Sequence, residues 1–431
     1  MKYLSWAYRA IRKNQGDHEV EICVADDASN DGTWEWCQER LDDDPNFRAI
    51  KNEGPERLGH TILYDRLVNE VASHDLCMIY HADMYLCPGA LDAIEKHMYS
   101  VDTFSREELR QDRLEEYERE TGEKIDKLNV KVKNPNTIVS LTRIEPPLHP
   151  PGPEKILQDF GIEPEEFDEE GLLEHVKLYQ PNLATTEGIF APWAFWKKDF
   201  QEIEGHDPIF APQSKEDTDI FNRFHLNGIK FIQTWEGFVY HMTCRGSRFA
   251  EGAERNPNGE VFMKNRETDE WLKQNIKSTR EFIRKWGHYC KHDKYMKPII
   301  PPKYDIGFVL KNSNTGALDA FEPWCSSVYA DGDTTEYYKR EQPNTHINLG
   351  HKLRHINDKK HNDIIVEIDC KKLTQEDITN IQRLPEIIEH SGETIGSFSL
   401  GNLNIDISAT NHFEDDLIFI TNNKNEEAKA N

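Results

Sequence analysis

The sequence predicts an α/β fold: a mixed sheet flanked by helices, with a smaller α+β domain towards the C-terminus. Short apolar, β-branched runs alternate with segments in which apolar residues recur at helical spacing. Two of these runs, Val20–Ala25 and Leu76–Tyr80, lead into acidic residues, which are Asp26 and Asp27 after the first and Asp83 after the second. Ligands of α/β sheets usually bind at the carboxyl ends of strands, so the pattern predicts a site where these two strands end.

The elements of the N-terminal part follow from local patterns. The chain is expected to open on a helix because Leu4, Ala7 and Ile11 share one helical face. Ser105 and Glu108 fit a capping box at the start of a charged, solvated helix. We expect helices over 3–13, 33–41, 62–72, 104–120, 154–176 and 214–227, and a further helix that begins at Pro88. We expect strands over 20–25, 47–51, 76–80, 137–144 and 230–241.

The length of 431 residues suggests two domains, or one large domain with an appendage. The proline-rich segment 298–302 is expected to be a linker. It would separate a first domain over 1–297 from a small α+β appendage over 303–422 in which no chemistry is indicated, with a disordered tail over 423–431. Within the appendage we expect strands over 305–310, 363–368, 395–399 and 403–407, and a helix near 375–390.

The chain is strongly acidic, which narrows the range of its partners. It carries 52 Lys and Arg against 78 Asp and Glu, a formal charge of −26. Such a surface repels a phosphate backbone, so a nucleic-acid partner is not expected. A nucleoside diphosphate remains compatible, because a divalent cation can bridge carboxylates and phosphates.

No membrane segment is expected. No apolar run approaches the about 20 residues that span a bilayer, and the first residues do not resemble a secretory signal. The eight cysteines lie far apart without a C-x-x-C pair, so reduced, mostly buried thiols are the ordinary interpretation. These features predict a soluble, cytoplasmic protein.

Two motifs resemble those of one enzyme family. The turn Asp26–Thr33 reads DDASNDGT and the segment His81–Asp83 reads HAD. They resemble the nucleotide-binding DDxSxDGT turn and a variant of the metal-binding DxD motif of the family 2 glycosyltransferases. The resemblance covers the first domain and implies a GT-A fold, a nucleotide-sugar donor (UDP-sugars above all) and Mn²⁺ or Mg²⁺ as cofactor. Family members normally begin with a strand inside the sheet; either the numbering here begins after a lost segment, or the sheet is built without that strand.

The resemblance implies roles for several charged residues. Asp26 and Asp27 would hydrogen-bond the base or the ribose, although such residues also cap helices. Asp83 would ligate the metal through a hard carboxylate oxygen, and His241, at the end of a predicted strand, resembles a further metal ligand. His81 replaces the first acid of the family motif, and it either ligates the metal, bonds to the ribose or is a core histidine.

Further residues are expected around the donor and the acceptor. Arg57, Arg245 and Arg248 would compensate the charge of the departing diphosphate, with solvated surface arginines as the alternative. Trp193 and Phe195 lie in an aromatic segment that resembles the family's acceptor-side wall. They are expected to stack on a sugar ring, although aromatic residues belong to the core more often.

The segment Glu216–Asp219 reads EDTD and matches the family's EDxD motif, in which the aspartate after the glutamate is the catalytic base. Asp217 lies on the same helical stripe as Ile220, Phe221 and Phe224, and the other acids of the segment are expected to point to the flank and the opposite side. A carboxylate that leads an apolar stripe faces inward, where burial raises its pKa. Asp217 is therefore the predicted base and Glu216 a predicted donor-binding residue, with simple complementation of the helix dipole as the alternative.

These inferences predict a metal-dependent, inverting glycosyltransferase of the hexosyl- or N-acetylhexosaminyltransferase type. It would transfer a sugar from a nucleoside-diphosphate donor to a hydroxyl of a glycan or a similar acceptor. A sugar nucleotidyltransferase is a weaker alternative, because the glycine- and arginine-rich phosphate loop of that class is missing near the start of the sequence. The alternative from another class is a non-catalytic glycan-binding or scaffold protein with a degenerate site.

Overall fold

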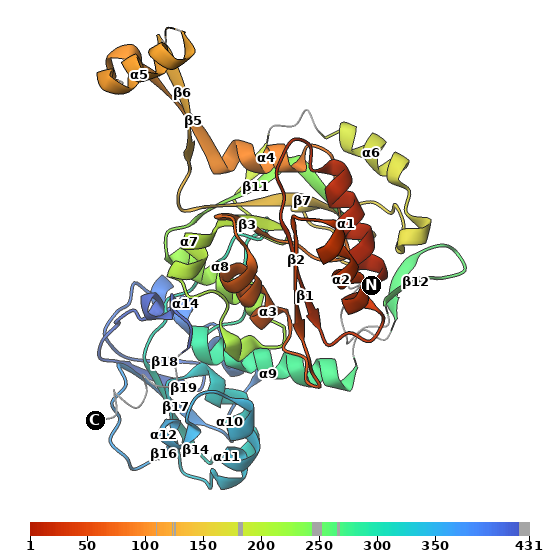
Figure 1. Cartoon of the computed structure of the whole chain (residues 1–431). Helices are drawn as coiled ribbons and strands as arrows, with labels where there is room; N and C mark the ends of the chain where they lie inside the picture. Colours follow the sequence, from red (N-terminus) through yellow and green to blue (C-terminus); the bar gives the residue numbers. More distant parts are fainter. Residues whose placement is uncertain are drawn as a thin grey trace.

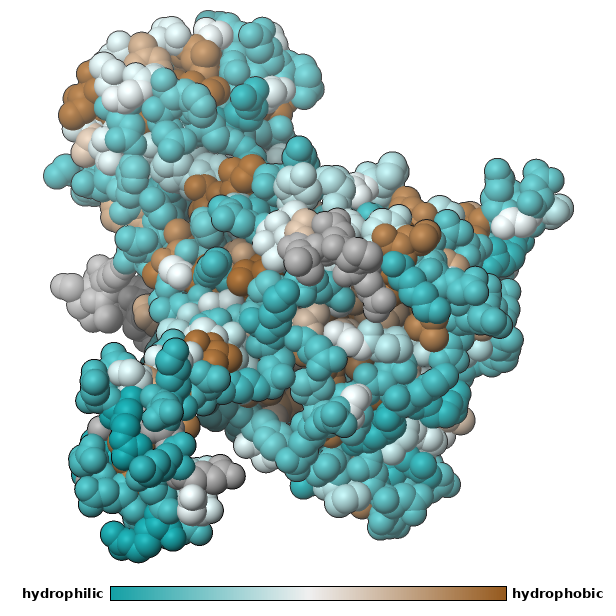
Figure 2. All heavy atoms as spheres, turned by 90° about the horizontal axis from the view of Figure 1, so that it is seen from above, coloured by the Kyte–Doolittle hydropathy of each residue, from teal (hydrophilic) through white to brown (hydrophobic). Residues whose placement is uncertain are grey.

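The computed structural model describes residues 1–421 apart from 109, 123, 125, 180–183, 244–251 and 265–267. Two large sheets organise these residues, one in the N-terminal part of the chain and one in the C-terminal part. Helix α9, Asp269–Trp286, lies between these two parts (Figure 1). This architecture confirms the predicted α/β class with an additional C-terminal sheet domain. The face seen in Figure 2 is mostly hydrophilic, with apolar residues in scattered patches, as a chain with 30% charged residues leads one to expect.

The larger sheet is built around β7, Thr137–Glu145, in which every residue is buried. β7 pairs in parallel with β11, Lys230–His241, and antiparallel with β10, Trp193–Trp196. β3, Leu76–Ile79, and β4, Met84–Leu86, lie at the two ends of the order β3-β10-β7-β11-β4. Two short strands, β8 (Lys155–Leu157) and β9 (Thr185–Thr186), pair with β7 and β11. The strands expected over 76–80, 137–144 and 230–241 are confirmed.

A separate two-stranded sheet precedes the larger one in the chain. β1, Ile22–Asp27, runs parallel to β2, Phe47–Asn52. Among the described residues no strand pairs with the other edge of β1, and β1 and β3 both line one cavity of about 1150 Å³. Both alternatives for the first strand therefore stay open, because either one leaves this edge of β1 without a strand among the described residues.

Helices connect and cover the strands of the N-terminal part, largely where helical spacing predicts them. They are α1 (Lys2–Asn14), α2 (Thr33–Asp43), α3 (His60–Arg66, continued by a π-helical turn over Leu67–Val71), α4 (Ala90–Met98), α6 (Glu169–Lys177), α7 (Lys197–Glu202) and α8 (Glu216–Leu226). In the described part of the chain, none of the helices combines the length and the apolar character that crossing a bilayer requires.

The helix expected over 154–176 is wrong for its first half. Residues Lys155–Leu157 form β8, which pairs in parallel with Arg143–Glu145 of β7, and only α6 is helical. The pairing with a fully buried strand outweighs the weak helical preference of this acidic segment.

The helix expected over 104–120 also begins later than predicted. β5, Tyr99–Ser105, and β6, Lys127–Lys133, form an antiparallel arm that projects from the molecule and carries α5, Gln111–Thr121, at its tip (Figure 1). Glu108 accepts hydrogen bonds from the backbone nitrogen and the hydroxyl of Ser105, both at 2.8 Å. This capping pair therefore ends a strand, because Phe104 is already paired with Leu128 of β6.

The C-terminal domain is a six-stranded sheet in the order β16-β15-β14-β17-β19-β18. Its strands are β14 (Ile306–Lys311), β15 (Ser327–Ala330), β16 (Leu353–His355), β17 (Ile364–Asp369), β18 (Gly396–Leu400) and β19 (Leu403–Ile407). The four expected strands are confirmed, whereas β15 and β16 were not predicted. The single helix expected near 375–390 is two helices, α13 (Gln375–Gln382) and α14 (Leu384–His390), and Pro385 stands in the first turn of the second.

Buried ion pairs fix α9 to the C-terminal domain. Arg284 binds Glu322 at 2.6 Å and also pairs with Glu341, and Lys352 binds the second oxygen of Glu322 at 2.7 Å. The side chains of Arg284 and Glu322 are 2% and 0% exposed. The domain boundary at 298–302 stays a prediction. Helix α9 precedes that segment in the chain, but its side chains pair with residues that follow the segment.

The same helix is tied to the N-terminal part by the next two residues. Lys285 binds Asp207 at 2.7 Å and Asp219 of α8 at 2.8 Å, and the indole nitrogen of Trp286 donates to Asp219 at 2.9 Å. Consecutive residues of α9 thus hold the two parts of the molecule together, and they also fix the helix that carries the candidate base.

We expect Arg284→Ala to lower the free energy of unfolding by about 3–5 kcal/mol, because it removes a buried counter-charge that Glu281, Glu322 and Glu341 share. Urea unfolding followed by tryptophan fluorescence measures the change. The matched control is Arg340→Ala, which removes the exposed pair with Asp319 and should cost no more than about 1 kcal/mol. Equal effects of the two substitutions would contradict the structural role of the buried network.

Candidate active site

The acidic turn at the end of β1 uses its two aspartates differently. Asp27 Oδ1 accepts from the amide of Asn52 at 2.8 Å and from the backbone nitrogen of Leu58 at 2.9 Å, and Oδ2 accepts from that of Gly59 at 2.9 Å. Asp26 is 2% exposed; its Oδ1 accepts from the nitrogen of Ser29, and its Oδ2 is buried without a partner. Asp27 therefore anchors the following loop, whereas Asp26 keeps one oxygen for another group.

The anchored loop brings His60 to the start of α8. Gly59 has a positive φ of 82°, and a Cβ there would lie 2.2 Å from the carbonyl oxygen of Pro212, so this contact requires glycine. His60 Nε2 then lies 2.5 Å from Glu216 Oε1. Burial opposes a charge on the ring, but the neighbouring carboxylates of Glu216 and Asp217 outweigh it and raise the pKa of His60.

The acids of α8 lie on more than one buried side of the helix. Ile220, Phe221 and Phe224 are buried in the core, as the predicted stripe requires. Glu216 is 6% exposed beside His60, and Asp219 is 0% exposed between Arg223, Lys285 and Trp286. The expectation that these two acids point away from the core is wrong, because α9 and the loop before α3 cover the sides that periodicity assigned to solvent.

Asp217 is the acid of this segment that keeps partial exposure. Burial, supported by the negative charge of Glu216, raises the pKa of Asp217 to about 6. For Glu216 itself burial is outweighed by the His60 ring, which lowers its pKa. Neighbouring carboxylates in one helical turn thus differ in proton affinity, the property that a base working near neutral pH needs.

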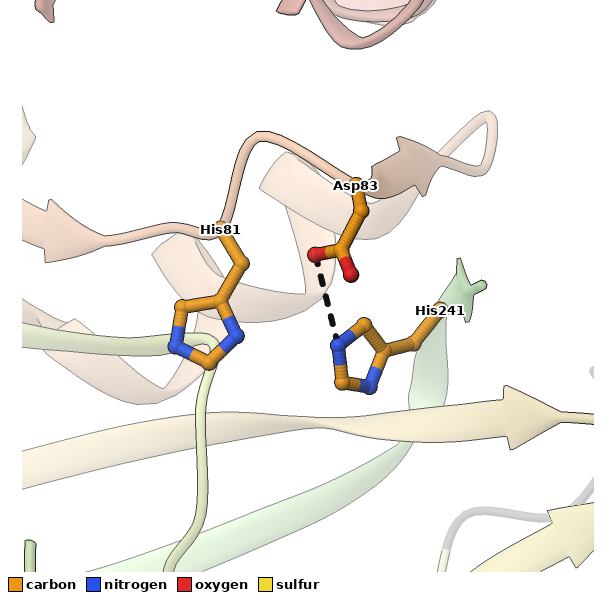
Figure 3. A group of neighbouring side chains, drawn as sticks. All are labelled: His81, Asp83 and His241. Atoms are coloured by element: carbon orange, nitrogen blue, oxygen red, sulfur yellow. Dashed lines mark ion pairs between the residues drawn. The ribbon is translucent and has the colours of Figure 1, made fainter. Parts of the chain in front are cut away.

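A second group of ligand-bearing side chains lies where β3, β4 and β11 meet. His81, Asp83 and His241 point towards one another (Figure 3), and one possible ligand atom of each lies within 4.8 Å of the others. His241 Nε2 lies 3.4 Å from Asp83 Oδ1. The register places His241 opposite Met84 of β4, and this pairing brings the end of β11 to Asp83.

The two histidines of this group have opposite proton affinities. Burial, assisted by the nearby His241, lowers the pKa of His81 to about 4. For His241 burial acts in the same sense, but the carboxylates of Asp83 and Glu145 outweigh it and raise the pKa to about 9. The neutral ring of His81 is in the form that binds a cation.

Glu145, which the sequence reasoning did not single out, orients His241. Its Oε1 accepts from Arg143 at 2.9 Å and faces His241 Nδ1 at 3.0 Å, and Lys155 lies 3.5 Å from Oε2. This contact occupies Nδ1 and leaves Nε2 directed towards Asp83. Glu145 is the last residue of buried β7. An acid at the carboxyl end of an apolar strand, the pattern that indicated Asp26, could therefore also have indicated Glu145.

Tyr64 connects the two groups. Its ring lies 5.6 Å from that of His60. Burial, followed by the charges of Asp217 and Asp83, raises the pKa of its hydroxyl. Arg143 likewise acts electrostatically on both His81 and Asp217. Asp217 and Asp83 therefore both act on the Tyr64 hydroxyl, and the site roles predicted for residues 27, 83, 217 and 241 stay predictions.

The remaining predicted residues divide into three cases. Arg57 is exposed in the loop before α3 and lines the cavity beside β1. Arg245 and Arg248 lie outside the described residues. Trp193 and Phe195 are 1% and 0% exposed, so the expectation that they stack on a sugar ring is wrong. Their rings pack in the core, 4.7 Å apart, against the aromatic side chains of α8 and α7.

Three comparisons relate the chain to known proteins. No curated protein sequence matches the chain. Among solved structures, GalNAc-T7 with UDP, GalNAc and Mn²⁺ is similar at 10% sequence identity and a TM-score of 0.35, over 56% of this chain and 40% of that chain. The model of the family described as glycosyl transferase family 2 matches residues 3–139, a span that includes the acidic turn and the His81–Asp83 segment. This N-terminal part of the chain is therefore similar to glycosyl transferase family 2.

Proposed function

We propose that the chain is a metal-dependent, inverting glycosyltransferase that transfers a sugar from a nucleoside-diphosphate donor, a UDP-sugar in the first instance, to a hydroxyl of a glycan or a similar acceptor. The observation that carries this proposal is the meeting of Asp217, with its raised pKa, and the His81–Asp83–His241 group around Tyr64. A nucleotide grip, a cation site and a base are the groups that such a transfer needs, and the match of residues 3–139 to the glycosyl transferase family 2 model supports the assignment.

The donor set fits a divalent cation such as Mn²⁺ or Mg²⁺. It offers one carboxylate and two imidazoles, of which His81 favours the neutral form and His241 is held through Nδ1 by Glu145. Bound there, the cation would neutralise the diphosphate of the donor. Asp26, with one unpartnered buried oxygen, is the better placed of the two turn aspartates to accept from the nucleotide, since Asp27 is committed to the loop.

In the proposed reaction Asp217 is the base. Its carboxylate takes the proton of the acceptor hydroxyl while that oxygen bonds to the anomeric carbon. The bond from this carbon to the diphosphate oxygen breaks on the opposite face, and the electron pair leaves with the nucleoside diphosphate, so the configuration inverts. His60 holds Glu216, and the negative charge of Glu216 keeps the pKa of Asp217 near neutrality.

Asp217→Asn should lower kcat for sugar transfer by about 10²-fold or more, because the amide cannot take the proton. Release of UDP from a panel of UDP-sugars in the presence of Mn²⁺ measures it. Asp269→Asn is the matched control, because Asp269 is an exposed acid in the first turn of α9 and should leave kcat unchanged. An intact chain that binds glycan but releases no UDP from any donor would instead favour the non-catalytic binding protein.

The pH dependence of kcat should show a rising limb near pH 6. Asp217 acts only when deprotonated, so activity falls as the pH drops through its pKa of about 6. Glu216→Gln removes the negative neighbour that raises this pKa, and the limb should then move to lower pH. If the rising limb of the kcat profile stays at the same pH in Glu216→Gln, the titrating group is not Asp217.

Metal binding is tested apart from turnover. Mn²⁺ titration followed by electron paramagnetic resonance should give at least a tenfold weaker Kd for Asp83→Asn, and about 10- to 100-fold weaker for Glu145→Gln, which releases His241. His390→Ala, at an exposed histidine of α14, is the control and should bind as the unmodified chain does. If Asp83→Asn binds Mn²⁺ with unchanged affinity, the cation does not bind at this site.

A further inference from the structure

The loop that leads into α8 has an unusual backbone. Ser214 and Lys215, the two residues directly before α8, have positive φ angles of 84° and 73°, in the left-handed region that residues other than glycine adopt only at an energetic cost. Such a conformation persists only where the surrounding structure holds it. We propose that Asn275 of α9 is the positioning residue that holds this loop, and that it thereby fixes the start of α8 and the orientation of Asp217. The inference rests on the proposed function, in which Asp217 is the base.

A single oxygen of Asn275 binds both left-handed residues. Its Oδ1 accepts from the hydroxyl of Ser214 at 3.0 Å and from Nζ of Lys215 at 3.2 Å. Glycine would adopt the same backbone without a steric cost, but it would offer neither of these donors. The side chains that make the left-handed backbone unfavourable are therefore also the ones that secure it. We expect the loop to keep its shape only while Asn275 accepts from them.

Two further residues of α9 hold the backbone just before this pair. The carbonyl oxygen of Gln213 accepts from Nε2 of Gln274 at 3.1 Å and from the hydroxyl of Ser278 at 3.3 Å. Ser278 follows Gln274 by one helical turn, and Nε2 of Gln274 also donates to its hydroxyl, at 2.9 Å. Residues 213–215 are therefore all bound to the same stretch of α9.

The loop before α3 gives the segment a second support. A Cβ at Gly59 would lie 2.2 Å from the carbonyl oxygen of Pro212, so the backbone at Pro212 packs directly on the loop that Asp27 anchors. Residues 212–215 thus contact the loop before α3 at one end and α9 at the other. The loop before α3 holds only Pro212, so the shape of the two left-handed residues depends on α9.

The backbone of Lys215 connects this loop to the helix that carries the candidate base. Its carbonyl oxygen accepts from the nitrogen of Asp219 at 3.0 Å, and its side chain makes no capping bond to the helix. The direction in which α8 starts therefore depends on the backbone angles of Lys215. Since burial is the main cause of the raised pKa of Asp217, a different start of α8 would change both the position and the proton affinity of this carboxylate.

Helix α9 is suited to this supporting role because it is fixed at its other end. Arg284 binds the C-terminal domain through Glu322, and Lys285 binds Asp207 and Asp219 in the N-terminal part. The C-terminal domain, in which the sequence indicates no chemistry, thereby contributes to the geometry of the candidate site. It does so through α9 and the loop before α8.

The kinetic test compares Asn275→Ala with Asn275→Asp in the full chain. Asn275→Ala removes the acceptor and should lower kcat for UDP release about tenfold, because Asp217 is misplaced. KM for the donor should change little, since the acidic turn and the cation group lie on other elements. Asn275→Asp keeps an acceptor oxygen and should keep kcat close to that of the unmodified chain, and the exposed α9 control Lys273→Ala should change neither constant. An unchanged kcat in Asn275→Ala, or an effect on KM alone, would overturn the proposal.

Substitutions at Lys215 test whether the backbone conformation is what matters. Glycine takes a positive φ without a steric cost, so adding Lys215→Gly to Asn275→Ala should restore part of the lost kcat. Lys215→Met keeps the unfavourable backbone but loses the donor, so by itself it should lower kcat. Circular dichroism checks folding, and if Asn275→Ala does not fold, Lys215→Met decides the outcome. The absence of any restoration by Lys215→Gly would contradict the proposal.

Hydrogen exchange separates this inference from the proposed function. The amide of Asp219, which donates to Lys215, should exchange about tenfold faster in Asn275→Ala than in the unmodified chain, and at an unchanged rate in Lys273→Ala. A chain that releases no UDP from any donor contradicts the proposed function, and the exchange rates then still decide whether Asn275 holds the start of α8. Unchanged exchange at Asp219 in Asn275→Ala would overturn the inference even if the chain is active.

Discussion

A buried histidine held between two carboxylates is the interaction on which the candidate site depends. His241 lies between Asp83 and Glu145, and the three residues come from the ends of β11, β7 and the turn before β4. Removing such charges from water costs several kcal/mol per ion unless each has a partner in good geometry. The parallel register of β7 with β11 and the antiparallel register of β4 with β11 supply that geometry. The sheet thus positions the side chains of the candidate cation site.

The acids of α8 differ in burial and in pairing because different segments of the chain cover the sides of the helix. Asp219 neutralises Lys285 and Arg223 and so belongs to the core. Glu216 pairs with His60, which the loop anchored by Asp27 brings into place. Asp217 remains between them, partly exposed and beside another negative charge. The same α9 residues that join the two parts of the molecule therefore also bury Asp219, whereas Asp217 stays partly exposed.

The acidic turn and the cavity beside it share one strand. β1 ends in Asp26, which borders the cavity, and in Asp27, which holds the loop leading to His60 and Glu216. The end of β1 therefore connects the cavity-lining Asp26 to the loop that positions His60.

The sequence by itself determined the local elements and the ends of strands. Apolar runs and helical stripes located β1, β3, β7, β11, α1 and α8. The acids at strand ends pointed to Asp26 and Asp83, and a motif resemblance pointed to the acids in the first turn of α8. These features depend on residues close in the chain, where spacing alone carries the information. The family motifs in residues 3–139 belong to the same local level.

Only the tertiary structure decided which residues meet and which are covered. Trp193 and Phe195 are core residues because α8 packs on them, and the segments around Phe104 and Lys155 are strands because β6 and β7 pair with them. The roles of His60 and Glu145 come from contacts across 156 and 96 residues of chain. Such contacts depend on the packing of distant segments, and a single sequence does not encode that packing in any local pattern.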